Sequence, residues 1–368
     1  MPLEILSPDS DAQLWHSAVA DLPASQRDIH LLPEYVRIYR DSYGDRPFLA
    51  RYRGSDGYIM QSFIRRNLCR LPFLSGAPDS GRFSDIANAY GYGAPVCSIA
   101  KGEEGYSLYR SFASEFAAWC EAEAIASEFG SLHPLMIEHQ RGLIGDTLPV
   151  AFVKDVIIIE LGADESKIAS GLRKGHRSSI ALARRSGVRI EKVESSVANL
   201  EAFRAMYEAT MLRRQAAERW FLPEGFFPLT CSSLGEKRTT LLFAFVGDEL
   251  ESGCLLMHDF STAYYHFAGT YAKHPGLGVN NLMVWEAALH AKRAGYQRLH
   301  LGGGITASTD DSLFRFKTGF SPDRAPLCTY FTVRNRAAYD ELCARKRMHE
   351  RQTTGVESQS DFLPLYRR

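Results

Sequence analysis

The sequence predicts an α/β protein with two domains, each a central sheet of mixed strand directions flanked by helices. Its 368 residues exceed what one ordinary core holds. The run Val156-Ile-Ile-Ile-Glu-Leu161 is typical of a strand buried on both faces. Strand-like and helical segments alternate after it. We place the domains at residues 1–152 and 153–345, followed by a polar tail at 346–368.

The first domain is predicted to mix helices and strands. Its expected elements, in order, are a helix over 11–20, a short proline-led helix over 32–39, a hairpin of strands 48–53 and 58–65, a long amphipathic helix over 105–124, and a strand or turn over 125–130. Gly54-Ser-Asp-Gly57 carries the hairpin signal, because glycine and aspartate favour tight turns between strands.

The second domain is predicted to follow the order β-α-β-α-β-β-β-α-β. After the strand at 156–161 we expect a helix over 166–185 capped by Gly187, a strand over 188–193, a helix over 197–219, strands over 239–246, 254–260 and 263–269, a glycine-bearing loop over 271–280, a helix reaching Gly295, and a strand over 296–301. The tail beyond Lys346 lacks a hydrophobic period, which predicts mobility up to Phe362.

Bulk composition excludes several classes of protein. Lys+Arg and Asp+Glu both total 43, so any anion site must be local. Seven scattered cysteines form no C-x-x-C pair, which suggests neither a zinc site nor a disulfide framework, and fits a cytoplasmic location. We expect no signal peptide, no membrane insertion, no metal and no cofactor.

A run of cations marks the predicted helix over 166–185. Arg173, Arg177 and Arg184 share one helical face, and Lys174 flanks it. No acidic residue interrupts the run, so it predicts a phosphate-binding surface that includes Arg173, Lys174 and Arg177. The alternative is a solvated helix face that pairs with acids elsewhere in the fold.

Three consecutive glycines, Gly302 to Gly304, follow a predicted strand. They indicate a sharp turn or a close backbone approach to a ligand, which makes Gly303 and Gly304 candidate binding residues. Lys317 follows in Phe314-Arg-Phe-Lys-Thr-Gly-Phe320, where a lysine can supply charge to an oxyanion or a phosphate. Arg315 in the same motif is a further candidate. A lysine with a merely packed stem is the alternative.

Tyr90 and Tyr92 lie in a glycine-rich loop preceded by Asp85, and these three residues are candidates for binding a substrate. A surface turn with packed tyrosines is equally consistent with this pattern. His266 is interpreted as a strand histidine rather than a base. The sequence holds no recognisable Ser/His/Asp set, P-loop, H-E-x-x-H motif or dinucleotide fingerprint.

Several of these segments together resemble the Fem-type (FemABX-like) aminoacyltransferases, relatives of the GNAT acyltransferases. The resemblance is strongest from Val156 to Tyr339. It rests on segments 172–177, 183–188, 211–217 and 278–282, on Leu301-Gly-Gly-Gly304, and on the motif around Lys317; segments 89–95 and 128–134 extend it into the first half.

The resemblance implies two GNAT-like domains and transfer of an amino acid from aminoacyl-tRNA to an amine, on a peptidoglycan precursor or a small-molecule intermediate such as an antibiotic precursor. It also implies that Lys317, in the late Phe-Lys motif, is the catalytic residue. The inserted helical arm of the bridge-forming members is not evident between Val193 and Thr240. An activated ester requires proximity, oxyanion stabilisation and a proton acceptor, but no nucleophilic residue.

Two other functions remain open on the sequence. The first is an N-acyltransferase that uses acyl-CoA or an acyl carrier. The loop His274-Pro-Gly-Leu-Gly-Val-Asn-Asn281 carries two glycines but not the complete pyrophosphate signature of acyl-CoA enzymes, which disfavours this alternative. The second is a non-catalytic protein that binds sugar or nucleic acid on the same fold.

Overall fold

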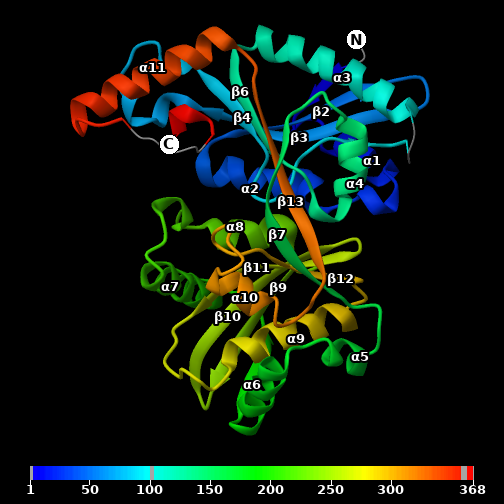
Figure 1. The fold of residues 1–368 in the computed structure, drawn as a ribbon, viewed down its shortest axis with the longest axis vertical. Coiled ribbons are helices and arrows are strands. Elements are labelled where there is room, and N and C mark those ends of the chain that lie inside the picture. Colours follow the sequence, from blue (N-terminus) through cyan, green and yellow to red (C-terminus); the bar gives the residue numbers. More distant parts are fainter. Residues whose placement is uncertain (1–2, 100–102, 358–362, 368) are drawn as a thin grey trace. The chain divides into compact units, whose positions relative to one another are not determined.

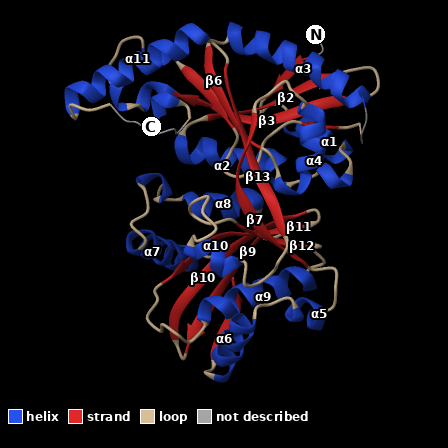
Figure 2. Ribbon diagram, viewed as in Figure 1, coloured by secondary structure: helices blue, strands red, loops and turns tan. Residues whose placement is uncertain are grey.

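The computed structural model describes residues 3–99, 103–357 and 363–367. The chain divides into two compact units (Figures 1 and 2). The first unit contains Met1–Val153 together with Leu327–Arg368, and the second contains Lys154–Pro326. Both are sheets flanked by helices, so the predicted α/β class with mixed strand directions is confirmed.

The sheet of the first unit has the strand order β1-β2-β3-β4-β6-β13, and β5 pairs with β3. Its strands are β1 (Leu3–Leu6), β2 (Arg46–Arg53), β3 (Tyr58–Asn67), β4 (Ser84–Ala87), β5 (Val96–Cys97), β6 (Ile125–Ser131) and the end of β13 (Arg324–Val333). Its helices are α1 (Ala12–Asp21), α2 (Pro33–Tyr43), α3 (Glu103–Ala122), α4 (Ile137–Ile144) and α11 (Arg336–Thr353). The predicted hairpin is present, with Arg53 opposite Tyr58.

The sheet of the second unit has the strand order β7-β12-β11-β10-β9-β8. Its strands are β7 (Val150–Glu160), β8 (Val188–Val193), β9 (Thr239–Val246), β10 (Glu249–Asp259), β11 (Thr262–Thr270) and β12 (Arg298–Gly302). Its helices are α5 (Glu165–Ser170), α6 (Lys174–Arg185), α7 (Val197–Arg213), α8 (Phe226–Leu234), α9 (Val279–Arg293) and α10 (Ser312–Lys317). β11 and β12 run parallel, whereas β8 to β11 are antiparallel neighbours.

The predicted helix over 166–185 is two helices in the structure. α5 ends at Ser170, and α6 begins at Lys174. The Arg173 N–H donates to the Gly319 carbonyl oxygen over 2.9 Å instead of continuing the helical ladder. A tertiary bond therefore replaces a local one at this break. The next helix, α7, ends at Arg213 rather than Arg219, because the chain turns at Gln215 with φ +51°.

The last part of the chain differs from the predicted second domain and tail. Residues 327–345 belong to the first unit, because β13 pairs with β6 and α11 packs beside β6. The polar segment after Lys346 continues α11 to Thr353. Tyr366 is fully buried, and its hydroxyl donates to Asp85 over 2.8 Å. The polar composition of the segment after Lys346 gave no indication that its end is anchored. The predicted mobility up to Phe362 extends into residues 358–362, which lie outside the described part.

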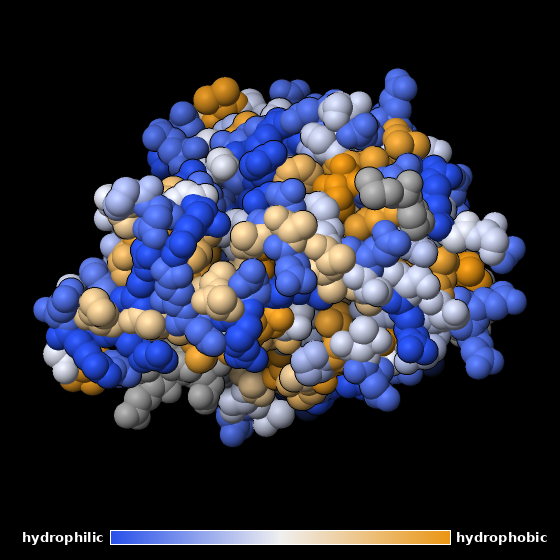
Figure 3. All heavy atoms as spheres, turned by 90° about the horizontal axis from the view of Figure 1, so that it is seen from above, coloured by the Kyte–Doolittle hydropathy of each residue, from blue (hydrophilic) through white to orange (hydrophobic). Residues whose placement is uncertain are grey.

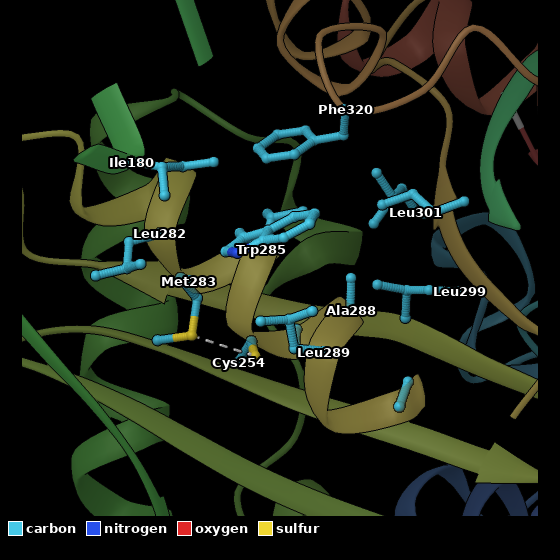
Figure 4. Packing of buried hydrophobic residues seen from close by; sticks show 14 of the residues in the cluster. Ile180, Cys254, Leu282, Met283, Trp285, Ala288, Leu289, Leu299, Leu301 and Phe320 are labelled. Carbon is cyan, nitrogen blue, oxygen red and sulfur yellow. Dashed lines mark hydrogen bonds between the residues drawn. The ribbon is translucent and has the colours of Figure 1, made fainter. Parts of the chain in front are cut away.

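The core of the second unit fixes the elements that carry the candidate site. The side chains of Ile180, Leu301 and Phe320 surround the Trp285 ring (Figure 4). Ile180 lies on α6, Leu301 on β12, Phe320 in the turn after α10 and Trp285 on α9. Below them Cys254 donates to the Met283 sulfur at 3.6 Å. Burying such side chains contributes about 1.5–3 kcal/mol each, so this packing holds α6, α9 and the exit of β12 together.

The described helices include none that combines the length and the apolar content needed to cross a membrane. On the face shown in Figure 3, hydrophilic residues cover most of the surface and hydrophobic ones lie in patches between them.

Candidate functional site

The parallel strands β11 and β12 separate at their carboxyl ends. Their pairing covers Thr262–Tyr264 against Arg298–His300, whereas β11 continues to Thr270 and β12 to Gly302. His266 is the extra residue of a bulge in β11 opposite Leu255 and Leu256. Bulges bend strands and occur next to active sites. The loops that follow the two strands thus leave the sheet at one edge, which is where open α/β sheets bind ligands.

The loop after β12 is built on glycine and closed by Asp311. Gly302 has φ +74°, a conformation that glycine adopts without strain. A side chain at Gly304 would lie 2.5 Å from Asp311 Oδ1. The Asp311 carboxylate accepts N–H groups from Ile305, Thr306 and the first turn of α10. Burial opposes ionisation, yet these hydrogen bonds prevail and lower the pKa of Asp311.

Lys317 and Lys154 bind this loop from two different elements. Lys317 Nζ donates to the Gly303 carbonyl oxygen over 2.8 Å, and Lys154 Nζ on β7 donates to that of Gly304 over 2.6 Å. Burial, and next the nearby Lys154 ammonium, lower the pKa of Lys317 to about 7. Burial also lowers the pKa of Lys154. With this pKa, the amine and the ammonium of Lys317 are both populated near neutral pH.

The start of α6 is attached to the turn that carries Lys317. The Arg173 N–H bond to Gly319 is one link, and His176 Nε2 bonded to the Phe316 carbonyl oxygen at 2.8 Å is another. A side chain at Gly319 would lie 2.2 Å from the His176 ring, so only glycine permits this contact. Burial lowers the pKa of His176, which favours the neutral ring that packs here. The sequence pattern did not single out His176 as a site residue.

The predicted cations of α6 lie at this attachment point. Arg173 and Lys174 are exposed, and neither forms an ion pair within the described structure. Arg177 is also exposed, but its guanidinium donates to the Leu172 and Ser170 carbonyl oxygens at the α5–α6 break. Arg184, further along α6, pairs with Glu286 at 2.7 Å. Arg173 and Lys174 at the start of α6 thus keep their charge available, as does the exposed Arg185 at its end, for which the described structure also shows no ion pair.

Seven predicted site residues therefore share the second unit. They are Arg173, Lys174, Arg177, Gly303, Gly304, Arg315 and Lys317. Arg315 is exposed on α10, beside Phe314 and Phe316 in the chain.

The loop after β11 is held by a buried carboxylate that the sequence pattern did not reveal. Glu251 on β10 accepts the N–H groups of Lys273 and His274, each over 3.2 Å, and lies 3.1 Å from His274 Nδ1. The loop then reaches Gly278, the N-cap of α9 with φ +75°. A glutamate within a strand carries no local signal for this role, because its partners lie more than twenty residues away.

The other predicted residues, Asp85, Tyr90 and Tyr92, belong to the first unit. Asp85 is fully buried and accepts hydrogen bonds from Arg66, Arg367 and Tyr366. Burial opposes its ionisation, but the two guanidinium groups outweigh burial and lower the pKa of Asp85. Its carboxylate thus anchors the end of the chain.

Tyr90 is exposed, and its carbonyl oxygen accepts the Tyr35 hydroxyl. Tyr92 lines a small hollow together with Asp28, His30 and His133. Its ring lies 4.6 Å from that of His133 and 5.1 Å from that of His30. The aromatic loop therefore surrounds a histidine cluster, which sequence spacing could not reveal because its members are a hundred residues apart.

Asp28, His30 and His133 offer the ligand types of a metal site. His133 Nδ1, however, accepts the Leu135 N–H over 3.1 Å. In the neutral ring the proton is then on Nε2, which lies 3.2 Å from Asp28 Oδ2 and donates to it. A metal needs the lone pair of that nitrogen, and metal-bound histidines donate their other N–H. This bonding favours a hydrogen-bonded cluster over a metal centre.

The second unit matches the family model described as an acetyltransferase (GNAT) domain over residues 170–317. This span contains the diverging strands, the glycine loop and Lys317. The second unit therefore carries a GNAT-type domain. No curated protein matches its sequence.

Solved structures extend the likeness in fold to both units. FemX superimposes with a TM-score of 0.63 at 13% identity, covering 92% of this chain and 99% of FemX. The DUF2156 domain of a candidate lysylphosphatidylglycerol synthetase from Agrobacterium fabrum gives 0.51 at 16% identity, covering 96% and 100%. A tandem GNAT protein from the clavulanic acid biosynthesis pathway gives 0.50 at 8% identity, covering 90% and 99%. These likenesses establish a tandem GNAT-like fold.

Proposed function

We propose that the protein is an aminoacyltransferase that moves an amino acid from aminoacyl-tRNA to an amine and forms an amide bond. The observation that carries the proposal is the Lys317 site. Lys317, at the end of α10, is partly buried and donates to the loop that follows β12. The turn after Lys317 is hydrogen-bonded to the cationic start of α6. The likeness to FemX and to a lysylphosphatidylglycerol synthetase domain supports an aminoacyl donor.

The groups in the second unit suit the parts of this reaction. Arg173 and Lys174 offer free charge to phosphates of the donor. In this proposal the Lys317 side chain meets the ester carbonyl, where an ammonium stabilises the developing oxyanion. The donor ester is already activated, so positioning the amine beside it supplies much of the rate. A peptidoglycan precursor or a small-molecule amine is the proposed acceptor, and catalysis in the cytoplasm is part of the proposal.

Acyl transfer from a thioester is the second candidate function. The tandem GNAT protein of the clavulanic acid pathway was solved without AcCoA, and its fold matches both units. The loop before α9 is also compatible with a phosphate group, because the first N–H groups of a helix favour anions. The missing part of the pyrophosphate signature, together with the cations of α6, places this candidate second.

A donor assay tests the choice. Purified protein is incubated with a pool of labelled aminoacyl-tRNAs, or with acetyl-CoA, and each donor is offered amine acceptors that include peptidoglycan precursors. We expect ribonuclease-sensitive transfer of label from tRNA into a product. Consumption of acetyl-CoA while tRNA remains inert would establish the second candidate instead. If neither donor reacts with any acceptor, a binding function on the same fold takes precedence.

A further inference from the structure

Two lysines from distant parts of the chain donate hydrogen bonds to the backbone carbonyl oxygens of two consecutive residues. Lys154 on β7 reaches Gly304, and Lys317 at the end of α10 reaches Gly303. An ammonium has three donors. The described structure assigns each of these side chains a single hydrogen bond, so both keep N–H groups for another partner.

Two ammonium groups on one loop disfavour each other's charge. The structure places them there with one acid nearby, Asp311, whose carboxylate is already engaged by backbone N–H groups. The carbonyl oxygens that hold the lysines accept hydrogen bonds from an amine as well as from an ammonium. Both lysines thus stay in place when one of them loses its proton.

We propose that Lys317 works as an amine that accepts and returns a proton, and that Lys154 is a positioning residue that, together with burial, favours this unprotonated form. This inference rests on the proposed aminoacyl transfer. It assigns the proton acceptor that the reaction requires.

Atoms and charge balance in the proposed step. The nitrogen of the acceptor amine attacks the ester carbonyl, and a C–N bond forms. The proton lost by that nitrogen passes to the Lys317 amine, which becomes an ammonium beside the oxyanion. The C–O bond to the ribose then breaks, and Lys317 returns the proton to the leaving oxygen. Lys317 finishes unprotonated, as it began, while Lys154 remains charged throughout.

The charge around Lys317 comes from several elements. The charged and titratable groups on those elements include Lys154, Asp155 and Glu160 on β7, Lys174, His176, Arg177, Arg184 and Arg185 on α6, Arg298 and His300 on β12, Asp311 and Arg315 at α10, and Arg324 on β13. Lys154 disfavours the protonated form of Lys317, and Asp311 favours it. Arg324 is engaged with the Phe314 ring and with Asp155. Lys154 is thus the cation whose removal tests the inference.

The test is the pH dependence of Lys317 labelling. An amine-reactive reagent such as acetic anhydride modifies only the unprotonated form, and mass spectrometry of the Lys317 peptide gives the extent at each pH. In the wild-type protein we expect a midpoint near pH 7. A midpoint at the ordinary lysine value, about 10.4, overturns the inference without any variant.

Substitutions of Lys154 then separate charge from packing. Lys154→Gln keeps a donor for the Gly304 carbonyl but removes the charge, so the Lys317 midpoint should move to higher pH. Lys154→Arg keeps the charge and should leave the midpoint where it is. Lys292→Met is the matched control, because Lys292 also binds carbonyl oxygens, those of Leu161 and Ala163, at the far end of α9. An unchanged midpoint in Lys154→Gln assigns Lys154 a structural role only.

Labelling requires neither the aminoacyl donor nor the amine acceptor, so its result is independent of the result of the donor assay. Where aminoacyl transfer is detected, kcat/KM should rise with pH through the labelling midpoint and shift upward in Lys154→Gln. A rate profile that does not follow the midpoint overturns the acid–base role of Lys317. A negative donor assay with a midpoint near pH 7 refutes the proposed function but retains the coupling of the two lysines.

Discussion

The Lys317 side chain donates to the Gly303 carbonyl oxygen over 2.8 Å and so lies against the loop that ends β12. Lys317→Met removes the amine and keeps a stem of similar size. We expect a loss of about 2–4 kcal/mol of transition-state stabilisation, roughly a 30-fold to 10³-fold fall in kcat, because one preorganised group at the oxyanion is removed. Steady-state transfer assays measure this.

Lys292→Met serves as the control for Lys317→Met. Lys292 is also half-buried, and its amine donates to two backbone carbonyl oxygens. Lys292 lies at the end of α9 that leads into the start of β12, whereas the glycine loop follows the other end of that strand, so kcat should be unchanged. Equal turnover of Lys317→Met and the wild type, with circular dichroism showing both folded, would remove Lys317 from the catalytic step.

The first turn of α6 should govern binding of tRNA. The double substitution Arg173→Gln with Lys174→Gln removes two exposed cations and keeps the Arg173 N–H bond to Gly319, which is a backbone bond. For every phosphate that these side chains no longer neutralise, the slope of log K against log salt should become shallower by about 0.7–0.9. Filter binding at several salt concentrations measures the slope.

Arg184→Gln is the comparison for this surface. Arg184 lies on the same helix but pairs with Glu286, so its charge is already compensated. The salt slope should stay near that of the wild type. If Arg184→Gln makes the salt slope as shallow as the double variant does, tRNA binding is spread along α6 rather than confined to its first turn.

Most of the fold could be predicted from the sequence because the elements are locally determined. The run at 156–161 forms the buried part of β7, and the hairpin at Gly54–Gly57 forms where turn residues require it. The break between α5 and α6 could not be predicted, since it follows from the Arg173 bond to Gly319, nearly 150 residues away. The anchored end of the chain could not be predicted for the same reason, because it depends on the distant contact between Tyr366 and Asp85.

The candidate site was predictable where glycine or charge left a local pattern. Gly302 to Gly304 and the cations of α6 are visible in the sequence and meet in the second unit. Lys154, His176 and Glu251 stand in ordinary strand or helix patterns, and only tertiary contacts bring them to the two loops. The aromatic loop gave a signal for Tyr92 but none for its histidine partners.

Gly278 should be among the positions of the second unit least tolerant of substitution. It has φ +75°, and an added Cβ would lie 2.4 Å from the Ser179 carbonyl oxygen of α6. Gly278→Ala combines backbone strain of about 1–2 kcal/mol with a collision against backbone, and α6 must move away from α9. We expect a loss of unfolding free energy clearly above the strain alone, measured by urea titration.

Gly276 separates the two contributions at Gly278. It has φ +88°, but an added Cβ would meet open space. Gly276→Ala should therefore cost only the backbone strain, about 1–2 kcal/mol. Equal losses in the two variants would show that α6 accommodates the Cβ without cost, contrary to the close packing of α6 against the start of α9.

Asp85 should control both stability and the end of the chain. Asp85→Asn leaves Arg66 and Arg367 without a carboxylate in a buried setting, and breaking such a pair costs about 3–5 kcal/mol. The Asp79 pair with Arg345 is more exposed, so Asp79→Asn should cost much less than Asp85→Asn. Urea unfolding compares the two, and limited proteolysis shows whether the residues after Thr353 are released.

The same carboxylate predicts how stability depends on pH. Because folding lowers the pKa of Asp85, its contribution is fully present above the ordinary value, 3.8, and is lost as pH falls through the lower folded value. Protonation on unfolding is thus favoured in acid, and wild-type stability should fall steeply below about pH 4. Asp85→Asn cannot take up this proton, so its unfolding free energy should start lower and fall less over the same range. Parallel curves for the two proteins would show that Asp85 ionises alike in the folded and unfolded chains, and the arginine pairing would then only offset the cost of burying the carboxylate.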